Sequence, residues 1–239
     1  MIEAYDYFGL NSLTDTRKYF NTEAHRKVAK TIQFSIQQGG IFALIGMVGS
    51  GKTTLLNRLQ NDIDKEGKVI VSRSLSTDKK RVNVNTLFTA LFYDLNKKEK
   101  QVKFPAAGEK RERELISLFK KYKKPVVLFI DEAHDLHGQT LIALKRIIEV
   151  VAQDGFILSI VLAGHPKLLN SLATASMEEI GARIETMSLD GSIGDNDKFI
   201  KWWFKESSNK TVSIESQISS DAIKFLAKEL LTPLQIIYY

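Results

Sequence analysis

The chain has 239 residues, 44% of them hydrophobic, which is enough for one large domain or for one domain with a small second one. It contains no cysteine, so disulfide bonds and thiolate metal sites are excluded, and no apolar run approaches the roughly 20 residues that cross a membrane; we expect a cytoplasmic protein. The net charge is +6, and residues 97–124 carry eleven Lys or Arg against four Glu, so one segment holds the whole positive excess.

Helical and strand patterns alternate along the chain. Apolar residues spaced three or four apart predict helices, and short continuous apolar runs predict buried strands. We expect strands at 40–45, 68–72, 126–130, 156–162 and 184–189. We expect helices at 22–37, 54–63, 85–95, 110–123, 139–153, 196–207 and 219–231. The first helix is expected to be capped by Thr22 or Asn21. This alternation predicts an α/β core with a parallel five-stranded sheet at residues 1–191 and a small helical lid at 192–239.

Residues 46–53 are the most informative segment. Their sequence, GMVGSGKT, fits the phosphate-binding pattern GxxxxGK[ST] at every fixed position, with a strand before it and a helix after it. Glycines let successive backbone N–H groups turn toward phosphate oxygens, Lys52 can reach the β- and γ-phosphates, and the Thr53 hydroxyl can ligate Mg²⁺. The expected ligands of ATP and Mg²⁺ in this segment are Gly46, Val48, Gly49, Ser50, Gly51, Lys52, Thr53 and Thr54.

Two carboxylates follow the apolar strand at 126–130. Asp131 comes at the carboxyl end of that strand, where open α/β sheets bind ligands, and we expect it to hold Mg²⁺ together with Thr53. We expect Glu132 to polarise the water that attacks ATP. The alternative is that these residues cap a helix, because acidic residues favour helix N-termini.

The order of these elements resembles one branch of the P-loop ATPases. Along the sequence, another strand, at 68–72, lies between the loop's strand and the acidic strand. An acidic strand separated from the loop's strand in this way, with a Glu after its Asp, resembles the additional-strand, catalytic-glutamate branch, and the helical lid resembles that of the AAA+ group. The AAA+ resemblance implies a sensor residue at the tip of the next strand, where His165 is the candidate, and an arginine finger that acts on a neighbour's ATP, where Arg183 is the candidate. The alternatives are a surface histidine before a proline turn and a surface arginine.

Four motifs resemble the ExeA-like group of ATPases. They are Tyr7-Phe8-Gly9-Leu10, Ile130-Asp131-Glu132-Ala133-His134, Ala163-Gly164-His165-Pro166-Lys167-Leu168 and Thr232-Pro233-Leu234-Gln235. With them the chain resembles the transposition-regulator ATPases MuB, TnsC and TniB and the ExeA-like ATPases. The resemblance implies an ATPase that assembles as a ring or helical filament on double-stranded DNA when ATP is bound, recruits a DDE-type transposase to the target site and disassembles on hydrolysis. In the TnsC branch a target-selection protein or an RNA-guided complex supplies the location.

The sequence departs from this group at one place and leaves the DNA contacts open. Many AAA+ lids carry an arginine near the start of the last helix; here residues 233–235 occupy that place, so hydrolysis is expected to be slow without a partner. DNA binding through phosphates would be strongly salt-dependent. The candidate basic residues are Lys79, Lys80 and Arg81, then Lys97, Lys98, Lys100 and Lys103, each with a solvated surface charge as the alternative.

Three further expectations concern the lid and the overall function. Trp202 and Trp203 either bind a partner or pack in the core, and core packing is expected for at least one. The chain stops on apolar residues just after a helix start at Pro233, so we expect the natural protein to continue past Tyr239. The functional alternatives are a helicase-loader-like or secretion-type ATPase, and a nucleotide-gated scaffold with vestigial hydrolysis.

Overall fold

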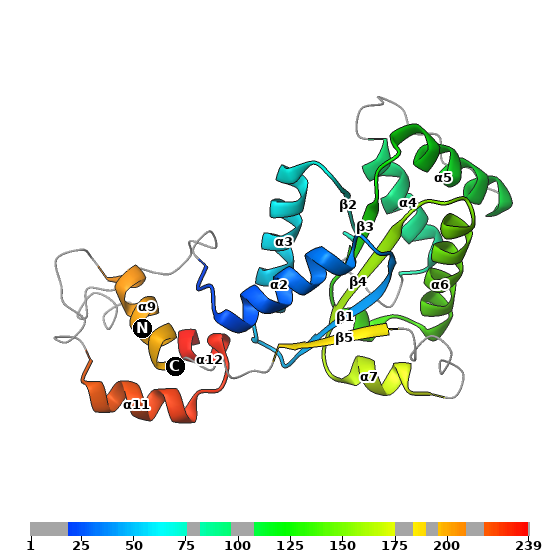
Figure 1. Ribbon diagram of the computed structural model, residues 1–239. Helices are drawn as coiled ribbons and strands as arrows, with labels where there is room; N and C mark the ends of the chain where they lie inside the picture. The colour runs from blue at the N-terminus through cyan, green and yellow to red at the C-terminus, as the bar shows by residue number, and fades with distance from the viewer. Residues whose placement is uncertain are drawn as a thin grey trace. The chain divides into compact units, whose positions relative to one another are not determined.

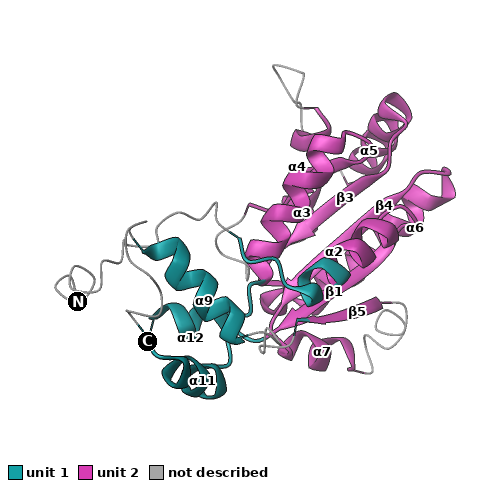
Figure 2. Cartoon of the chain, turned by 60° about the vertical axis from the view of Figure 1, so that its left-hand side comes forward, with its two compact units in different colours: residues 1–27, 47–51, 189–239 teal, residues 28–46, 52–188 magenta. Residues whose placement is uncertain are grey.

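The protein divides into two compact units (Figure 2). A computed structural model describes residues 19–75, 82–96, 108–174, 184–189, 196–208 and 218–238. One unit comprises residues 28–46 and 52–188, and the other comprises residues 1–27, 47–51 and 189–239. The loop residues 47–51 therefore group with the C-terminal helices rather than with the sheet strand that precedes them.

A five-stranded sheet forms the centre of the larger unit, with the order β2-β3-β4-β1-β5 (Figure 1). The strands are β1 (Gly40–Gly46), β2 (Ile70–Arg73), β3 (Val126–Ile130), β4 (Leu158–Gly164) and β5 (Ile184–Leu189). The pairs β2–β3, β3–β4 and β4–β1 are all parallel, which confirms the predicted sheet. The strand that separates β1 from β3 in space is β4, whereas the strand predicted at 68–72 becomes β2 at the edge of the sheet.

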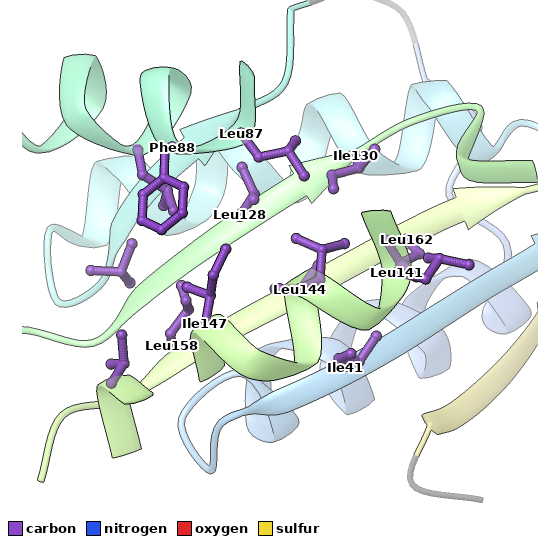
Figure 3. Close-up of a cluster of buried hydrophobic side chains, with 14 of the residues drawn as sticks. Ile41, Leu87, Phe88, Leu128, Ile130, Leu141, Leu144, Ile147, Leu158 and Leu162 are labelled. Carbon is purple, nitrogen blue, oxygen red and sulfur yellow. The ribbon is translucent and has the colours of Figure 1, made fainter. Parts of the chain in front are cut away.

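Three helices cover one face of this sheet. They are α4 (Val84–Leu95), α5 (Gly108–Tyr122) and α6 (Gly138–Gln153). Leu87 and Phe88 of α4 and Leu141, Leu144 and Ile147 of α6 pack over alternate strand residues Ile41, Leu128, Ile130, Leu158 and Leu162 (Figure 3). Every residue of β3 is buried because both of its faces are covered, which explains the continuous apolar run in the sequence.

The opposite face carries α2 (Glu23–Ser35) and α3 (Lys52–Glu66). Because side chains alternate along a strand, Ser159 points away from the face that Leu158 and Ile160 occupy. Its buried hydroxyl donates to the carbonyl of Ile36, just after α2, at 2.7 Å. At the other end of α2, the His25 amide donates to Thr22 Oγ1 at 3.0 Å, so Thr22 is the N-cap, one of the two residues expected to cap this helix.

Some element boundaries differ from the predicted ones. β4 begins at Leu158 rather than at residue 156, because Gly155 adopts a φ of +77° after α6 and the Phe156 amide still donates to Val151 of that helix. Two short helices, η2 (Ala133–Asp135) and α7 (Lys167–Leu172), were not predicted, since three and six residues are too few for a helical pattern to be recognised. No helix of the described residues is both long and apolar enough to cross a bilayer.

Within residues 196–208 and 218–238, the smaller unit contains the helices α9 (Asn196–Ser207), α11 (Ser220–Glu229) and α12 (Pro233–Tyr238). Their buried contacts come from Phe199, Ile200, Ile223 and Ile236. The Asn196 amide group donates to the carbonyls of Ala227 and Leu230, at 3.1 and 2.9 Å, and so joins the start of α9 to the end of α11. Trp203 is only 8% exposed, which confirms core packing for one of the two tryptophans.

Candidate nucleotide site

The loop between β1 and α3 has the backbone that its glycines predict. Gly49 and Gly51 have φ angles of +81° and +89°, a region that residues with a Cβ rarely adopt. The Ser50 amide donates to the Met47 carbonyl at 3.2 Å, which closes a turn inside the loop. Ser50 is buried, and its hydroxyl has no hydrogen-bond partner among the described residues. A buried hydroxyl of this kind suits a loop that receives a phosphate oxygen.

Lys52 is the first residue of α3 and is only 7% exposed. Its ammonium group donates to the carbonyl of Gly46, at the end of β1, at 2.9 Å. Burial lowers the pKa of Lys52, and the negative charges of Glu132 and Asp131 act against that shift. The ammonium is thus held, partly desolvated, at the end of the strand that leads into the loop.

Thr53 and Asp131 lie far apart in the sequence but are in direct contact. The Thr53 hydroxyl donates to Asp131 Oδ2 at 2.7 Å, and the other carboxylate oxygen accepts the amide of Glu132 at 2.9 Å. Hydroxyl and carboxylate oxygens are ligands that Mg²⁺ accepts, and Mg²⁺ commonly takes one or two of them and completes its shell with water and phosphate. The described residues contain no cluster of three or more His, Cys, Asp or Glu side chains for a metal. Thr53 and Asp131 together thus present two oxygen ligands of the kind that Mg²⁺ accepts.

Glu132 has a left-handed backbone, with φ of +53° and ψ of +38°. It precedes η2, but its side chain makes no capping hydrogen bond. The Glu132 carboxylate therefore does not cap this helix. Instead Oε2 lies 3.3 Å from Nδ1 of His134. Non-glycine residues in this region cost of order 1–3 kcal/mol and cluster at functional sites.

His165 follows the last residue of β4. The Lys167 amide donates to His165 Nδ1 at 3.2 Å, so the neutral ring carries its proton on Nε2 and can donate from there. Its ring centre is 6.0 Å from that of His134. The sheet order therefore brings the ends of β3 and β4 side by side, with Asp131, Glu132 and His165 at one edge. Arg183, Lys79, Lys80, Arg81, Lys97, Lys98, Lys100 and Lys103 lie outside the described residues.

The Thr232–Gln235 motif is a helix start that contacts the loop. The amides of Leu231 and Thr232 donate to Gln235 Oε1, at 2.8 and 3.0 Å, while the Gln235 amide donates to the Thr232 hydroxyl at 3.3 Å. This reciprocal arrangement is a capping box, with Pro at the first helical position. The Leu234 amide reaches the Gly49 carbonyl at 3.4 Å, and a Cβ on Gly49 would lie 2.5 Å from Leu234 Cβ. No pattern in the sequence predicted this contact.

His25 packs beside the same loop. It is 6% exposed, and its Nε2 would lie 3.5 Å from a Cβ on Gly51. Burial lowers the pKa of His25, while backbone hydrogen bonds with Ser50 and Phe20 act in the opposite direction. No residue pattern in the sequence singled out this histidine.

The lowered pKa of His25 predicts a loss of stability in acid. Below the ordinary histidine pKa of about 6.5 the unfolded chain takes up a proton that the folded protein resists, so the free energy of unfolding falls as the pH drops, by at most about 1.4 kcal/mol per pH unit. Urea unfolding at pH 7.5, 6.5 and 5.5 measures this. The difference in stability between the wild type and His25→Gln should shrink toward low pH. A difference that stays constant across this range would contradict the assignment.

With this geometry in view, comparison with known proteins decides the family. A model of the family described as "AAA domain" matches residues 35–172, more than half of the chain. The chain belongs to the AAA domain family. Its 35% identity to the putative hemin import ATP-binding protein HrtA of Staphylococcus haemolyticus extends over 75 residues, which are 28% of this chain and 34% of that protein.

Several solved structures have a similar fold. Cdc6p from Pyrobaculum aerophilum superposes with a TM-score of 0.63 at 16% identity, over 97% of this chain and 62% of that one. The Aeropyrum pernix ORC1 protein in complex with DNA gives 0.60 at 15% identity, over 94% and 60%. AMPPCP-bound DnaA from Aquifex aeolicus gives 0.51 at 19%, over 95% and 63%. The chain thus spans about three fifths of the length of these proteins. Their structural similarity confirms the predicted P-loop AAA+ fold.

Proposed function

We propose that this AAA domain protein binds ATP with Mg²⁺ and hydrolyses it. The observation that carries the proposal is the 2.7 Å contact between Thr53 Oγ1 and Asp131 Oδ2, because it joins the first turn of α3 to the tip of β3 with the two ligand types that Mg²⁺ uses. The proposed nucleotide contacts are those of Gly46, Val48, Gly49, Ser50, Gly51, Lys52, Thr53 and Thr54. When bound, Mg²⁺ would neutralise phosphate charge.

Each side chain then has a separate task. Lys52 exchanges the Gly46 carbonyl for phosphate oxygens, and its partly desolvated charge strengthens that contact. Glu132 accepts a hydrogen bond from the attacking water and orients it, and His165 donates from Nε2 to the nucleotide. Phosphoryl transfer depends mainly on positioning and charge stabilisation, so these residues need no covalent step. Arg183 is the proposed finger on a neighbour's nucleotide.

We further propose that ATP drives assembly on double-stranded DNA, that the assembly recruits a DDE-type transposase, and that hydrolysis releases it. The support comes from four motifs that resemble those of the ExeA-like group, to which the transposition regulators are related in the resemblance above, and from the basic segment at 97–124. Electron microscopy of the protein with DNA and a slowly hydrolysed ATP analogue tests the proposal. Rings or helical filaments that require both ligands are expected, and no association with DNA at low salt would rule the proposal out.

DNA binding through phosphates predicts a defined salt dependence. Each lost phosphate contact reduces the slope of log K against log salt by about 0.9, so Lys79→Ala/Lys80→Ala/Arg81→Ala should flatten it by about 3. Fluorescence anisotropy on duplexes of unrelated sequence measures the slope, and the loss should be the same on each. The matched control removes three exposed lysines of α9 and α11, Lys201, Lys205 and Lys228, and should leave the slope nearly unchanged. Equal slopes in all three proteins would exclude residues 79–81 from the contact.

A replication-type role is the second candidate. The similar structures include Cdc6p, ORC1 with DNA and AMPPCP-bound DnaA, which supports an AAA+ protein that acts on DNA without a transposase. The two candidates differ in the partner that stimulates turnover. ATPase assays with DNA plus transposase, or with DNA plus a replicative helicase, separate them, because only the true partner should raise kcat.

A further inference from the structure

His134 lies between the ends of two neighbouring strands. Its Nδ1 is 3.3 Å from Glu132 Oε2, after β3, and 3.4 Å from the amide nitrogen of His165, after β4. Its side chain is 22% exposed, against 52% for that of Glu132. One ring nitrogen of His134 therefore faces both the proposed catalytic carboxylate and the residue at the tip of the adjacent strand.

These two partners require opposite states of Nδ1. The carboxylate of Glu132 can only accept, so it needs a proton on Nδ1, whereas the His165 amide can only donate, so it needs a lone pair there. In the neutral ring the proton moves between Nδ1 and Nε2, and Nδ1 serves one partner at a time. Whether Nδ1 bonds to Glu132 or to the His165 amide determines whether the Glu132 carboxylate is held or released.

The surroundings are built for this close approach. Gly164 is the last residue of β4, and a Cβ on it would lie 3.2 Å from the His134 amide nitrogen and 3.5 Å from Nδ1. A side chain at that position would push His134 away from the strand. The Glu132 carboxylate is half exposed on a left-handed backbone, so without a contact it would sample several rotamers. The His134 contact selects one of them and leaves Oε1 for a water molecule.

We propose that His134 is a positioning residue that orients the Glu132 carboxylate toward the attacking water, and that exchange of Nδ1 between Glu132 and the His165 amide couples this carboxylate to the tip of β4. The inference rests on the proposed ATPase function of the same site. His134 touches neither substrate nor metal in this scheme, and it acts only through Glu132.

Three substitutions test the geometry of the ring. Asn places a polar atom near Nδ1, Gln places one near Nε2, and Ala removes both. His134→Ala and His134→Gln should lower kcat about 10- to 100-fold with KM for ATP unchanged, because the general base is misplaced and binding is not. His134→Asn should recover most of the rate. An unchanged kcat in His134→Ala, or equal activity of the Gln and Asn variants, would overturn the inference.

A second measurement does not depend on turnover. Nitrogen-15 NMR resolves the ring nitrogens of the four histidines, and His134→Asn assigns the signals of His134. In the nucleotide-free protein, Glu132→Gln should shift the Nδ1 signal of His134, and an unmoved signal would overturn the contact. If the unmodified protein binds ATP but never turns it over with DNA and partner present, the ATPase proposal fails and this inference with it. An active wild type with a fully active His134→Ala overturns this inference alone.

Discussion

Glu132→Gln is expected to lower ATP turnover roughly 10²- to 10⁴-fold while the affinity for ATP stays nearly unchanged. Gln keeps the length of the side chain but cannot accept a proton from water, and the Thr53–Asp131 pair and Lys52 remain in place to bind the nucleotide. Steady-state phosphate release gives the rate, and titration with a fluorescent ATP analogue gives the affinity.

The matched control for this variant is Glu149→Gln on α6. Glu149 is nearly as exposed as Glu132, with 46% of its side chain accessible against 52%, and lies 3.6 Å from Lys145 in an ion pair along α6, so its loss should change stability by about 1 kcal/mol at most and turnover not at all. Because hydrolysis is the proposed release step, the Glu132→Gln protein should also stay bound to DNA for longer than the wild type when ATP is present. Equal turnover in both variants would mean that Glu132 is not the base, whereas no turnover in the unmodified protein with DNA and transposase would favour the scaffold alternative.

The loop and the acidic strand were predictable because both obey local rules. GMVGSGKT fixes the positions that need glycine backbones, and the φ angles of Gly49 and Gly51 agree with it. The apolar run of β3 predicts a strand buried on both faces, and the carboxyl end of a parallel strand fixes where Asp131 lies. The contact of Thr53 with Asp131 follows from these two facts together.

The remaining features depend on contacts that no local pattern encodes. Sheet order is one, since β4 rather than the 68–72 strand lies between β1 and β3. The capping box at Thr232 is visible in the sequence, but the Gly49 carbonyl that α12 meets is not. His134 belongs to a recognisable motif, yet its two competing partners emerge only when β3 and β4 are paired.

Gly49→Ala is expected to destabilise the protein and to abolish tight nucleotide binding. An alanine at a φ of +81° costs roughly 1–2 kcal/mol of backbone strain, and its Cβ would lie 2.5 Å from Leu234 Cβ and 3.1 Å from the Thr232 hydroxyl, so overpacking adds about 1–3 kcal/mol more. To relieve the clash the loop must shift, and every 1.4 kcal/mol of distortion energy lowers the affinity for ATP about tenfold.

Gly155→Ala separates strain from overpacking. Gly155 has nearly the same φ, +77°, but a Cβ there would meet nothing within 4 Å. This variant should therefore be destabilised only by the added backbone strain, roughly 1–2 kcal/mol, and should bind ATP normally. Urea unfolding and nucleotide titration of both variants make the comparison.

A double variant tests the contact with Leu234 directly. In Gly49→Ala/Leu234→Ala the Cβ of residue 234 remains, so the clash remains. In Gly49→Ala/Leu234→Gly that Cβ is removed, so this variant should recover part of the ATP affinity. If Gly49→Ala behaves like Gly155→Ala in both measurements, the start of α12 does not constrain the phosphate loop.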